Sequence, residues 1–88
     1  MGPPRPSLPY WWSWHLFITD HAAERMEQRG LTEVELRRFL LDPSTIDHDA
    51  VSGRWRVKCG PPAQPWIIIV QPEKTRRRLA VITIFRIG

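Results

Sequence analysis

The sequence predicts an α+β domain in which two helices precede an antiparallel sheet, and three patterns support this fold class. Thr32 and Glu35 have the spacing of a capping box, in which a threonine N-cap and a glutamate three residues later satisfy free amides at the start of a helix. Residues 54–59 alternate strictly between basic and apolar or aromatic side chains, which is typical of a strand with one buried face. Residues 66–71 form a β-branched run that suits a central strand, and residues 79–87 are apolar on both faces, so we expect that strand to be covered on both sides.

The first helix is expected over residues 21–29. Thr19 or Asp20 provides its N-cap, and Gly30 supplies the left-handed residue that commonly ends a helix. The second helix runs from the capping box to about Leu41, because the residue before Pro43 is pushed out of the helical region.

The remaining segments predict short strands and turns. The second half of residues 10–18 suits an edge strand, and residues 45–50 suit a weak strand. Turns or loops are expected at residues 52–53, 60–65 and 72–77, which are rich in glycine, proline or polar side chains. The predicted order is therefore an arm, an edge strand, two helices and then antiparallel strands joined by hairpins, with three to five strands in the sheet.

The N-terminal segment differs from the rest in composition. Residues 1–9 contain four prolines, which exclude a helix and favour an extended arm. Trp11, Trp12 and Trp14 follow, and side chains this apolar either lie over the core or form a surface for a partner. We therefore divide the chain into a proline- and tryptophan-rich arm over residues 1–15 and an α+β domain over residues 16–88.

Length and composition exclude several classes of protein. A chain of 88 residues is one small domain, and 42% hydrophobic with 25% charged residues is an ordinary globular balance. The longest apolar run, residues 66–70, is far shorter than the roughly 20 residues of a membrane span, and the N-terminus does not resemble a secretory signal. A single cysteine excludes an internal disulfide. We expect a cytoplasmic protein without a membrane partner.

The net charge of +4 is unevenly distributed. Residues 1–50 carry −3 and residues 51–88 carry +7, and 11 of the 13 basic residues are arginine. The guanidinium group matches the geometry of phosphate better than the lysine ammonium does. This balance favours an anionic partner, either a nucleic acid or an acidic protein, and the alternative is a solvated charged face.

Two stretches carry side chains suited to chemistry on a phosphate. On the first helix, His21, Arg25 and Arg29 share a polar stripe, and the alternative is a solvated stripe paired with glutamates. On the alternating strand, Arg54, Arg56 and Lys58 project from one face about 6–7 Å apart, close to the phosphate repeat of a nucleic-acid strand.

Other candidates are weaker. Trp55 and Trp66 are stacking platforms if exposed and core residues if not. Thr83 interrupts an apolar run, so it is either a β-branched residue that stabilises the strand or a polar group that faces a site. Residues 76–78 (Arg76, Arg77 and Arg78) are a solvated run or contact phosphates without specificity. The three histidines are scattered, so we expect no metal, and Cys59 is expected to be a small core residue.

Residues 20–32 resemble the opening helix of the bacterial domain of unknown function 4258. That family begins with a histidine, followed by an arginine–methionine pair, an arginine–glycine step and a capped second helix. The Asp42-Pro43 step and a closing strand with the pattern of residues 81–85 (VITIF) are similar as well. The resemblance covers about residues 17–87 and leaves the proline arm and its tryptophans outside.

This family is similar in fold to RelE-like and BrnT-like toxins and to the barnase, EndoU and colicin ribonucleases. The resemblance implies two N-terminal helices packed on a curved antiparallel sheet, and metal-independent RNA cleavage without a cofactor. It places His21, Arg25, Arg29 and Thr83 at the site, and we add Arg54 and Arg86 from their position and charge.

Three functions follow as alternatives. The first is an endoribonuclease that acts as the toxin of a toxin–antitoxin pair. In it, His21 acts as base or acid, and Thr83 positions a phosphate oxygen. The phosphorane is stabilised by Arg25, Arg54 and Arg86. RNA, free or on the ribosome, is bound by the basic residues Arg29, Arg56, Lys58, Arg76, Arg77 and Arg78. Alternatively, the chain is a non-catalytic module whose Trp11, Trp12 and Trp14 bind an antitoxin or a second copy, or it is an RNA-binding regulator.

Overall fold

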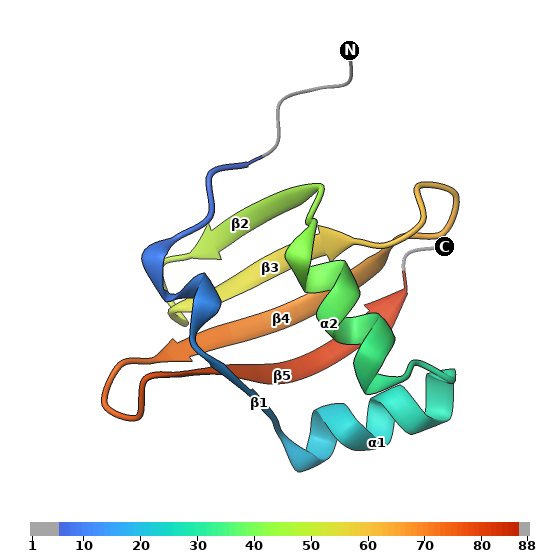
Figure 1. The fold of residues 1–88 in the computed structure, drawn as a ribbon, viewed down its shortest axis with the longest axis horizontal. Coiled ribbons are helices and arrows are strands. Elements are labelled where there is room, and N and C mark those ends of the chain that lie inside the picture. Colours follow the sequence, from blue (N-terminus) through green and yellow to red (C-terminus); the bar gives the residue numbers. More distant parts are fainter. Residues whose placement is uncertain (1–5, 87–88) are drawn as a thin grey trace.

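The structure, a computed structural model, describes residues 6–86 and confirms the α+β class (Figure 1). A 3-10 helix and one strand precede two α-helices and four more strands. In chain order the elements are η1 (Tyr10–Ser13), β1 (His15–Ile18), α1 (Asp20–Arg29), α2 (Glu33–Leu41), β2 (Thr45–Asp49), β3 (Arg54–Cys59), β4 (Trp66–Glu73) and β5 (Arg78–Arg86). The five strands form one sheet in the order β1-β5-β4-β3-β2. Residues 1–5 and Ile87, which the predicted arm and last strand included, lie outside the described residues.

One strand pairing differs from the antiparallel arrangement that the sequence predicts. Strands β2 to β5 pair antiparallel, but β1 lies parallel to β5. A tight hairpin forces neighbouring strands to run antiparallel, whereas β1 continues into α1 and meets β5 only at the end of the chain. The apolar pattern of β1 shows that it is a strand and does not encode its direction.

Both helices start and end at the predicted signals. The Thr19 hydroxyl accepts a hydrogen bond from the Ala22 amide at 3.2 Å, and Gly30 ends α1 in the left-handed conformation with φ of 71°. At α2, Thr32 and Glu35 form the complete capping box. These local signals need no tertiary contact, which is why the sequence predicts them well.

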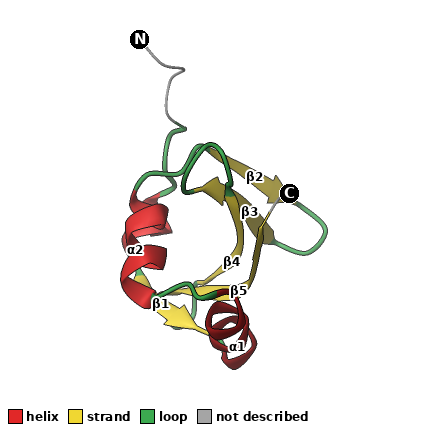
Figure 2. Cartoon of the chain, turned by 90° about the vertical axis from the view of Figure 1, so that its right-hand side faces the viewer, coloured by secondary structure: helices red, strands yellow, loops and turns green. Residues whose placement is uncertain are grey.

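The sheet curves around α2, which covers its inner face, while α1 lies along the edge beside β5 (Figure 2). The fully buried Leu36 of α2 and Ala22 of α1 pack with the apolar sides of β3, β4 and β5. Burial of these side chains is the main stabilising contribution in so small a domain. None of the described helices is long and apolar enough to cross a membrane.

The tryptophans lie on or in this core. Trp11 is 6% exposed, and Trp12 and Trp14 pack against the core while remaining partly exposed. Trp66 is buried, and Trp55 is half-buried with its ring 5.2 Å from that of Trp11. Burial of Trp11 and Trp66 therefore favours the core interpretation for these two.

Cys59 is a core residue, as predicted. Its side chain is fully buried among the apolar residues of the inner face. Burial raises the pKa of the thiol to about 12, so the nucleophilic thiolate is not formed near neutral pH.

A β-bulge in β5 changes which face its second half presents. Val81 pairs with Val70, but Thr83 pairs with Ile69, so Ile82 is an extra residue in β5. Without it, Thr83 would follow Val81 onto the inner face, because alternate residues of a strand share a face. The bulge instead turns Thr83 to the outer face of the sheet.

Candidate nucleic-acid interface

The outer face of the sheet is not covered by either helix (Figure 2). Arg54, Arg56 and Lys58 of β3 are exposed there, and the alternate residues Val57 and Cys59 lie in the core. Ile67 is 1% exposed although it does not belong to the core cluster, so outer-face side chains must shield it. The expectation that the last strand is covered on both sides is confirmed for β5 except at Arg86, since its other residues are buried or half-buried; on the outer face neighbouring side chains, and not a helix, provide the cover.

A cross-strand row on this face contains the principal candidates. Arg56 of β3 pairs with Ile69 of β4, and Ile69 pairs with Thr83 of β5. The row continues onto α1, because the Nε2 atom of His21 lies 3.2 Å from the Thr83 hydroxyl. An imidazole, a hydroxyl and a guanidinium thus flank Ile69, with the backbones of Arg56 and Thr83 on the order of 10 Å apart across two strand spacings.

The position of His21 is determined by the junction between β1, the bulge and α1. Strand β1 pairs with β5 only as far as Val81, and from there α1 takes over the edge of β5. The Thr19 hydroxyl donates to the carbonyl oxygen of Val81 at 2.7 Å while it caps α1. The first turn of the helix, with His21, is therefore held beside the second half of β5.

Arg56 reaches across β4. Its guanidinium carbon lies 5.6 Å from the centre of the Phe85 ring on β5, two strands away. Arg54 and Arg56 also line a hollow of about 350 Å³; its other lining residues are Ile69, Trp55, Asp49 at the end of β2 and Ser52 of the following turn. The outer face therefore has, on one side of Ile69, a hollow lined by two arginines and one aspartate, and on the other side the His21–Thr83 pair.

The structure does not bring all the predicted site residues together. Arg25 and Arg29 are exposed further along α1. Arg86 points to the inner side of the sheet, because it alternates with Phe85, and its guanidinium lies 4.5 Å from the centre of the Trp66 ring. Among the arginines of β3 and β5, Arg56 shares the row with His21. We expected Arg56 only to bind RNA.

The three arginines at the β4–β5 turn lie at the far end of the sheet. Arg76 and Arg77 are exposed, and Arg77 has a positive φ of 47°. Arg78 forms an ion pair with Glu73, and its guanidinium lies 3.7 Å from the centre of the Phe17 ring. Arg78 is thus already engaged within the protein.

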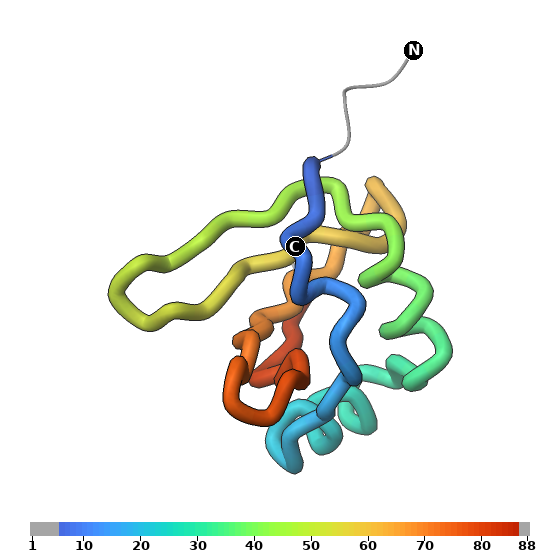
Figure 3. The backbone as a smooth tube through the Cα atoms, turned by 60° about the vertical axis from the view of Figure 1, so that its left-hand side comes forward, coloured from blue at the N-terminus to red at the C-terminus, as the bar shows by residue number. Residues whose placement is uncertain are grey.

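An acidic edge borders the basic strand. Asp47 and Asp49 of β2 stand directly opposite Arg56 and Arg54, on the same face. Figure 3 shows the hairpin of these two strands, drawn green to yellow, extending from the rest of the chain. Hydrogen bonds from the Ser52 hydroxyl and from the amides of Val51 and Ser52 lower the pKa of Asp49 below its usual value. This carboxylate is therefore charged at neutral pH and reduces the local positive charge.

The sequence of the domain matches a known family. The family model described as Domain of unknown function (DUF4258) matches residues 18–86. The chain belongs to the DUF4258 family. Comparison with curated proteins and with solved structures found no match.

Two residues at the site of this DUF4258 domain could not be predicted from the sequence. Ile69 and Phe85 lie on the outer face beside the predicted residues, yet both belong to runs with the pattern of a buried strand. For Phe85 the inserted residue at Ile82 is the cause, because it changes the face of Thr83 and Phe85 and leaves no mark in the residue pattern. Ile69 lies on β4 and joins the site only through its pairing with Arg56 and Thr83, which the pattern of a single strand does not encode. Within residues 6–86, no group of three or more histidine, cysteine, aspartate or glutamate side chains is arranged to hold a metal ion.

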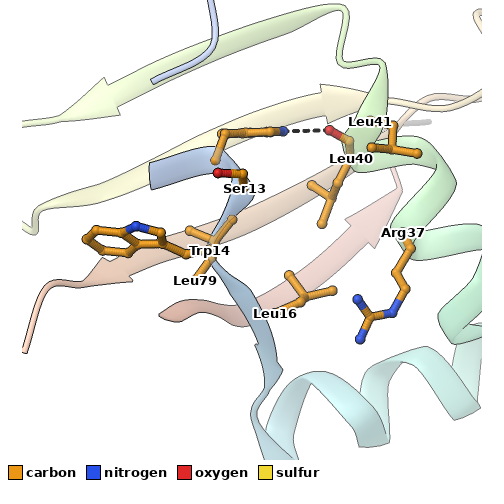
Figure 4. A pocket seen from close by; sticks show the side chains of 8 residues that line it. Ser13, Trp14, Leu16, Arg37, Leu40, Leu41 and Leu79 are labelled. Atoms are coloured by element: carbon orange, nitrogen blue, oxygen red, sulfur yellow. Dashed lines mark hydrogen bonds between the residues drawn. The ribbon is translucent and has the colours of Figure 1, made fainter. Parts of the chain in front are cut away.

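The DUF4258 domain and the segment before it together form an apolar groove on the other side of the molecule (Figure 4). It has a volume of about 340 Å³ and lies between η1, β1 and α2; its lining residues are Trp12, Ser13, Trp14, Leu16, Arg37, Leu40, Leu41 and Leu79. The indole N–H of Trp12 donates to the carbonyl oxygen of Leu40 at 2.7 Å, which ties the segment to α2. Leu41 is 78% exposed at the rim of the groove.

Proposed function

We propose that this protein is a small metal-independent endoribonuclease and the toxin of a toxin–antitoxin pair. The observation that supports this most strongly is the row on the outer face, where His21 and Thr83 lie across Ile69 from Arg56. The resemblance of the domain to RelE-like and BrnT-like toxins agrees with this activity, and it is a fold-level analogy.

The proposed reaction is an internal transfer at phosphorus. A base removes the proton of the ribose 2′-hydroxyl, and that oxygen forms a bond to the adjacent phosphorus. The bond from phosphorus to the 5′-oxygen breaks, and an acid protonates the departing oxygen, which leaves a 2′,3′-cyclic phosphate and a 5′-hydroxyl. Arginines stabilise the additional negative charge of the pentacovalent intermediate.

We assign these roles to side chains of the row. His21 is the candidate base or acid, because histidine exchanges protons near neutral pH. The Thr83 hydroxyl, 3.2 Å away, orients the imidazole or a phosphate oxygen. Arg56, which shares the row, is the candidate to neutralise the phosphorane from β3, whereas Arg25 lies exposed one turn beyond His21 on α1 and is a candidate to contact the RNA backbone.

The test is cleavage of a mixed-sequence RNA by the purified protein, with the product ends identified by mass. We expect His21→Ala to lose at least about 100-fold in rate, the usual scale for an acid–base group, and EDTA to leave the rate unchanged. His48→Ala is the matched control, because His48 is also exposed but stacks on Trp55, on the inner side of the sheet. Equal rates for His21→Ala and the wild type would remove His21 from the mechanism. RNA binding without cleavage, on free RNA and on translating ribosomes, would instead indicate an RNA-binding regulator.

The apolar groove favours a second candidate function, a module that binds protein. Exposed apolar side chains such as Leu41 and the partly exposed Trp12 and Trp14 line it, as a docking surface requires. The occupant is an antitoxin or a second copy of the chain. Leu41→Glu should abolish self-association measured by sedimentation, whereas Val51→Glu, at a residue 98% exposed outside the groove, should not. A wild-type chain that stays monomeric at high concentration would exclude the second copy as the occupant.

A further inference from the structure

Phe85 has a position that the proposed reaction does not use. It lies two residues beyond Thr83 on the same face of β5, about 6.6 Å along the strand. That distance is close to the repeat of one nucleotide in an extended strand. A phosphate held at Thr83 therefore places a neighbouring nucleotide over Phe85.

The surroundings of the ring suit a flat ligand. Phe85 is partly exposed, and the Arg56 guanidinium lies 5.6 Å from the centre of its ring. An aromatic ring and a guanidinium plane are the two groups on which proteins stack unpaired bases. Lys58, one step along β3 from Arg56, is exposed on the same face and supplies a further charge for the backbone.

We propose that Phe85 and Arg56 form a stacking subsite for the base next to the reacting phosphate, so that the RNA acted on is single-stranded. This inference rests on the proposed function, because His21 and Thr83 define which phosphate reacts. A base within a duplex is stacked on both faces and offers no free face to Phe85. Only an unpaired base can enter the subsite without first leaving a helix.

The competing explanation is that Phe85 only shields the sheet from water. That role requires an apolar side chain of similar size but not an aromatic face. Phe85 stands directly opposite Ile67, which is 1% exposed, so the ring also shields this isoleucine. Leucine would provide similar apolar cover without a π face. The variants Phe85→Leu and Phe85→Trp therefore separate stacking from shielding.

The experiment measures the dissociation constants of 2′-O-methyl RNA oligomers, single-stranded and duplex, at one fixed salt concentration. These probes lack the attacking hydroxyl, so binding is measured without cleavage. Phe85→Leu should weaken single-strand binding by roughly 5- to 100-fold, the scale of losing one base–aromatic stack, and Phe85→Trp should bind like the wild type. Duplex binding should be unchanged in both. Phe17→Leu is the control, because Phe17 is also exposed on the sheet but lies under Arg78, away from the row.

Two results would overturn the subsite: single-strand binding by Phe85→Leu equal to that of the wild type, or equal losses for single strand and duplex. Cleavage of the corresponding 2′-hydroxyl RNA separates this inference from the proposed function. If the wild type does not cleave but Phe85→Leu selectively loses single-strand binding, the subsite stands and the enzymatic proposal fails. If the wild type cleaves and Phe85→Leu binds and cleaves equally well, the subsite alone fails.

Discussion

The hydroxyl of Thr19 connects three parts of the structure that must meet for His21 to reach Thr83. Its oxygen accepts from the Ala22 amide at 3.2 Å and donates to the Val81 carbonyl at 2.7 Å, directly before the bulge. The Thr19 amide also donates to the same carbonyl oxygen at 3.2 Å. One residue thus caps α1, ends the pairing of β1 and aligns the helix with β5.

Replacing Thr19 tests this connection. Thr19→Val keeps the β-branched shape and removes the hydroxyl, so we expect a loss of about 1–3 kcal/mol in the free energy of unfolding in urea. Thr19→Ser keeps the hydroxyl and should lose less. Equal stability of the valine variant and the wild type would show that the hydroxyl does not hold α1 in place.

The buried thiol of Cys59 predicts a loss of stability at alkaline pH. Its pKa in the folded protein is raised by burial to about 12, above the value of an exposed thiol near 8.5–9. The unfolded chain therefore releases this proton first, and the contribution of Cys59 is complete below about pH 8.5 and declines as the pH rises towards 12. Urea unfolding at pH 7, 9 and 10.5 should show a steeper decline for the wild type than for Cys59→Ala. Parallel declines, or rapid alkylation of the native thiol at pH 7, would contradict the assignment.

At the scale of elements, the β2–β3 hairpin places opposite charges side by side. Asp47 stands opposite Arg56, and Asp49 stands opposite Arg54, so the acidic edge reduces the attraction of β3 for phosphates. The hairpin thereby limits how strongly the outer face binds any polyanion.

This arrangement makes the response to charge changes predictable. Asp47→Asn should strengthen RNA binding at low salt. Arg56→Glu should weaken it and flatten the dependence of log K on log salt, by roughly 0.7 for each phosphate that the protein no longer neutralises. Glu33→Gln is the matched control, since Glu33 pairs with Arg37 on α2 at 2.8 Å, away from the sheet face. Affinities that do not depend on salt would contradict the role of the basic strand.

The elements also show what can be predicted from the residues. The caps of Thr19 and Thr32, the alternation of β3 and the runs of β4 and β5 are local patterns, and the structure confirms them. The bulge at Ile82 is a property of the pairing between two strands, and it decides which face Thr83 presents relative to Val81. Thr83 and Arg86 both follow the bulge and lie three residues apart, so ordinary alternation puts them on opposite faces. His21 and Thr83, predicted by the family resemblance, do meet, whereas Arg86 was chosen from its position and charge and lies on the other side.

At the scale of the whole molecule, the two candidate surfaces lie on opposite sides. The row of His21, Thr83, Ile69 and Arg56 on the outer face lies within the part that matches the DUF4258 family, whereas the apolar groove is completed by Trp12 and Trp14, which precede that part. A partner in the groove would leave the His21–Thr83 pair open. The two surfaces can therefore be altered independently.

The most direct test of the central claim compares RNA cleavage by Arg56→Ala and Arg86→Ala at equal protein and RNA concentrations. Both variants remove one arginine that contacts an aromatic ring, but Arg56 shares the outer face with His21 and Arg86 lies on the inner side. We predict that Arg56→Ala loses at least about 100-fold in kcat/KM, the scale of removing a group that stabilises the developing charge, and that Arg86→Ala stays within a few-fold of the wild type. A larger loss for Arg86→Ala than for Arg56→Ala would contradict the placement of the reaction on the outer face of the sheet.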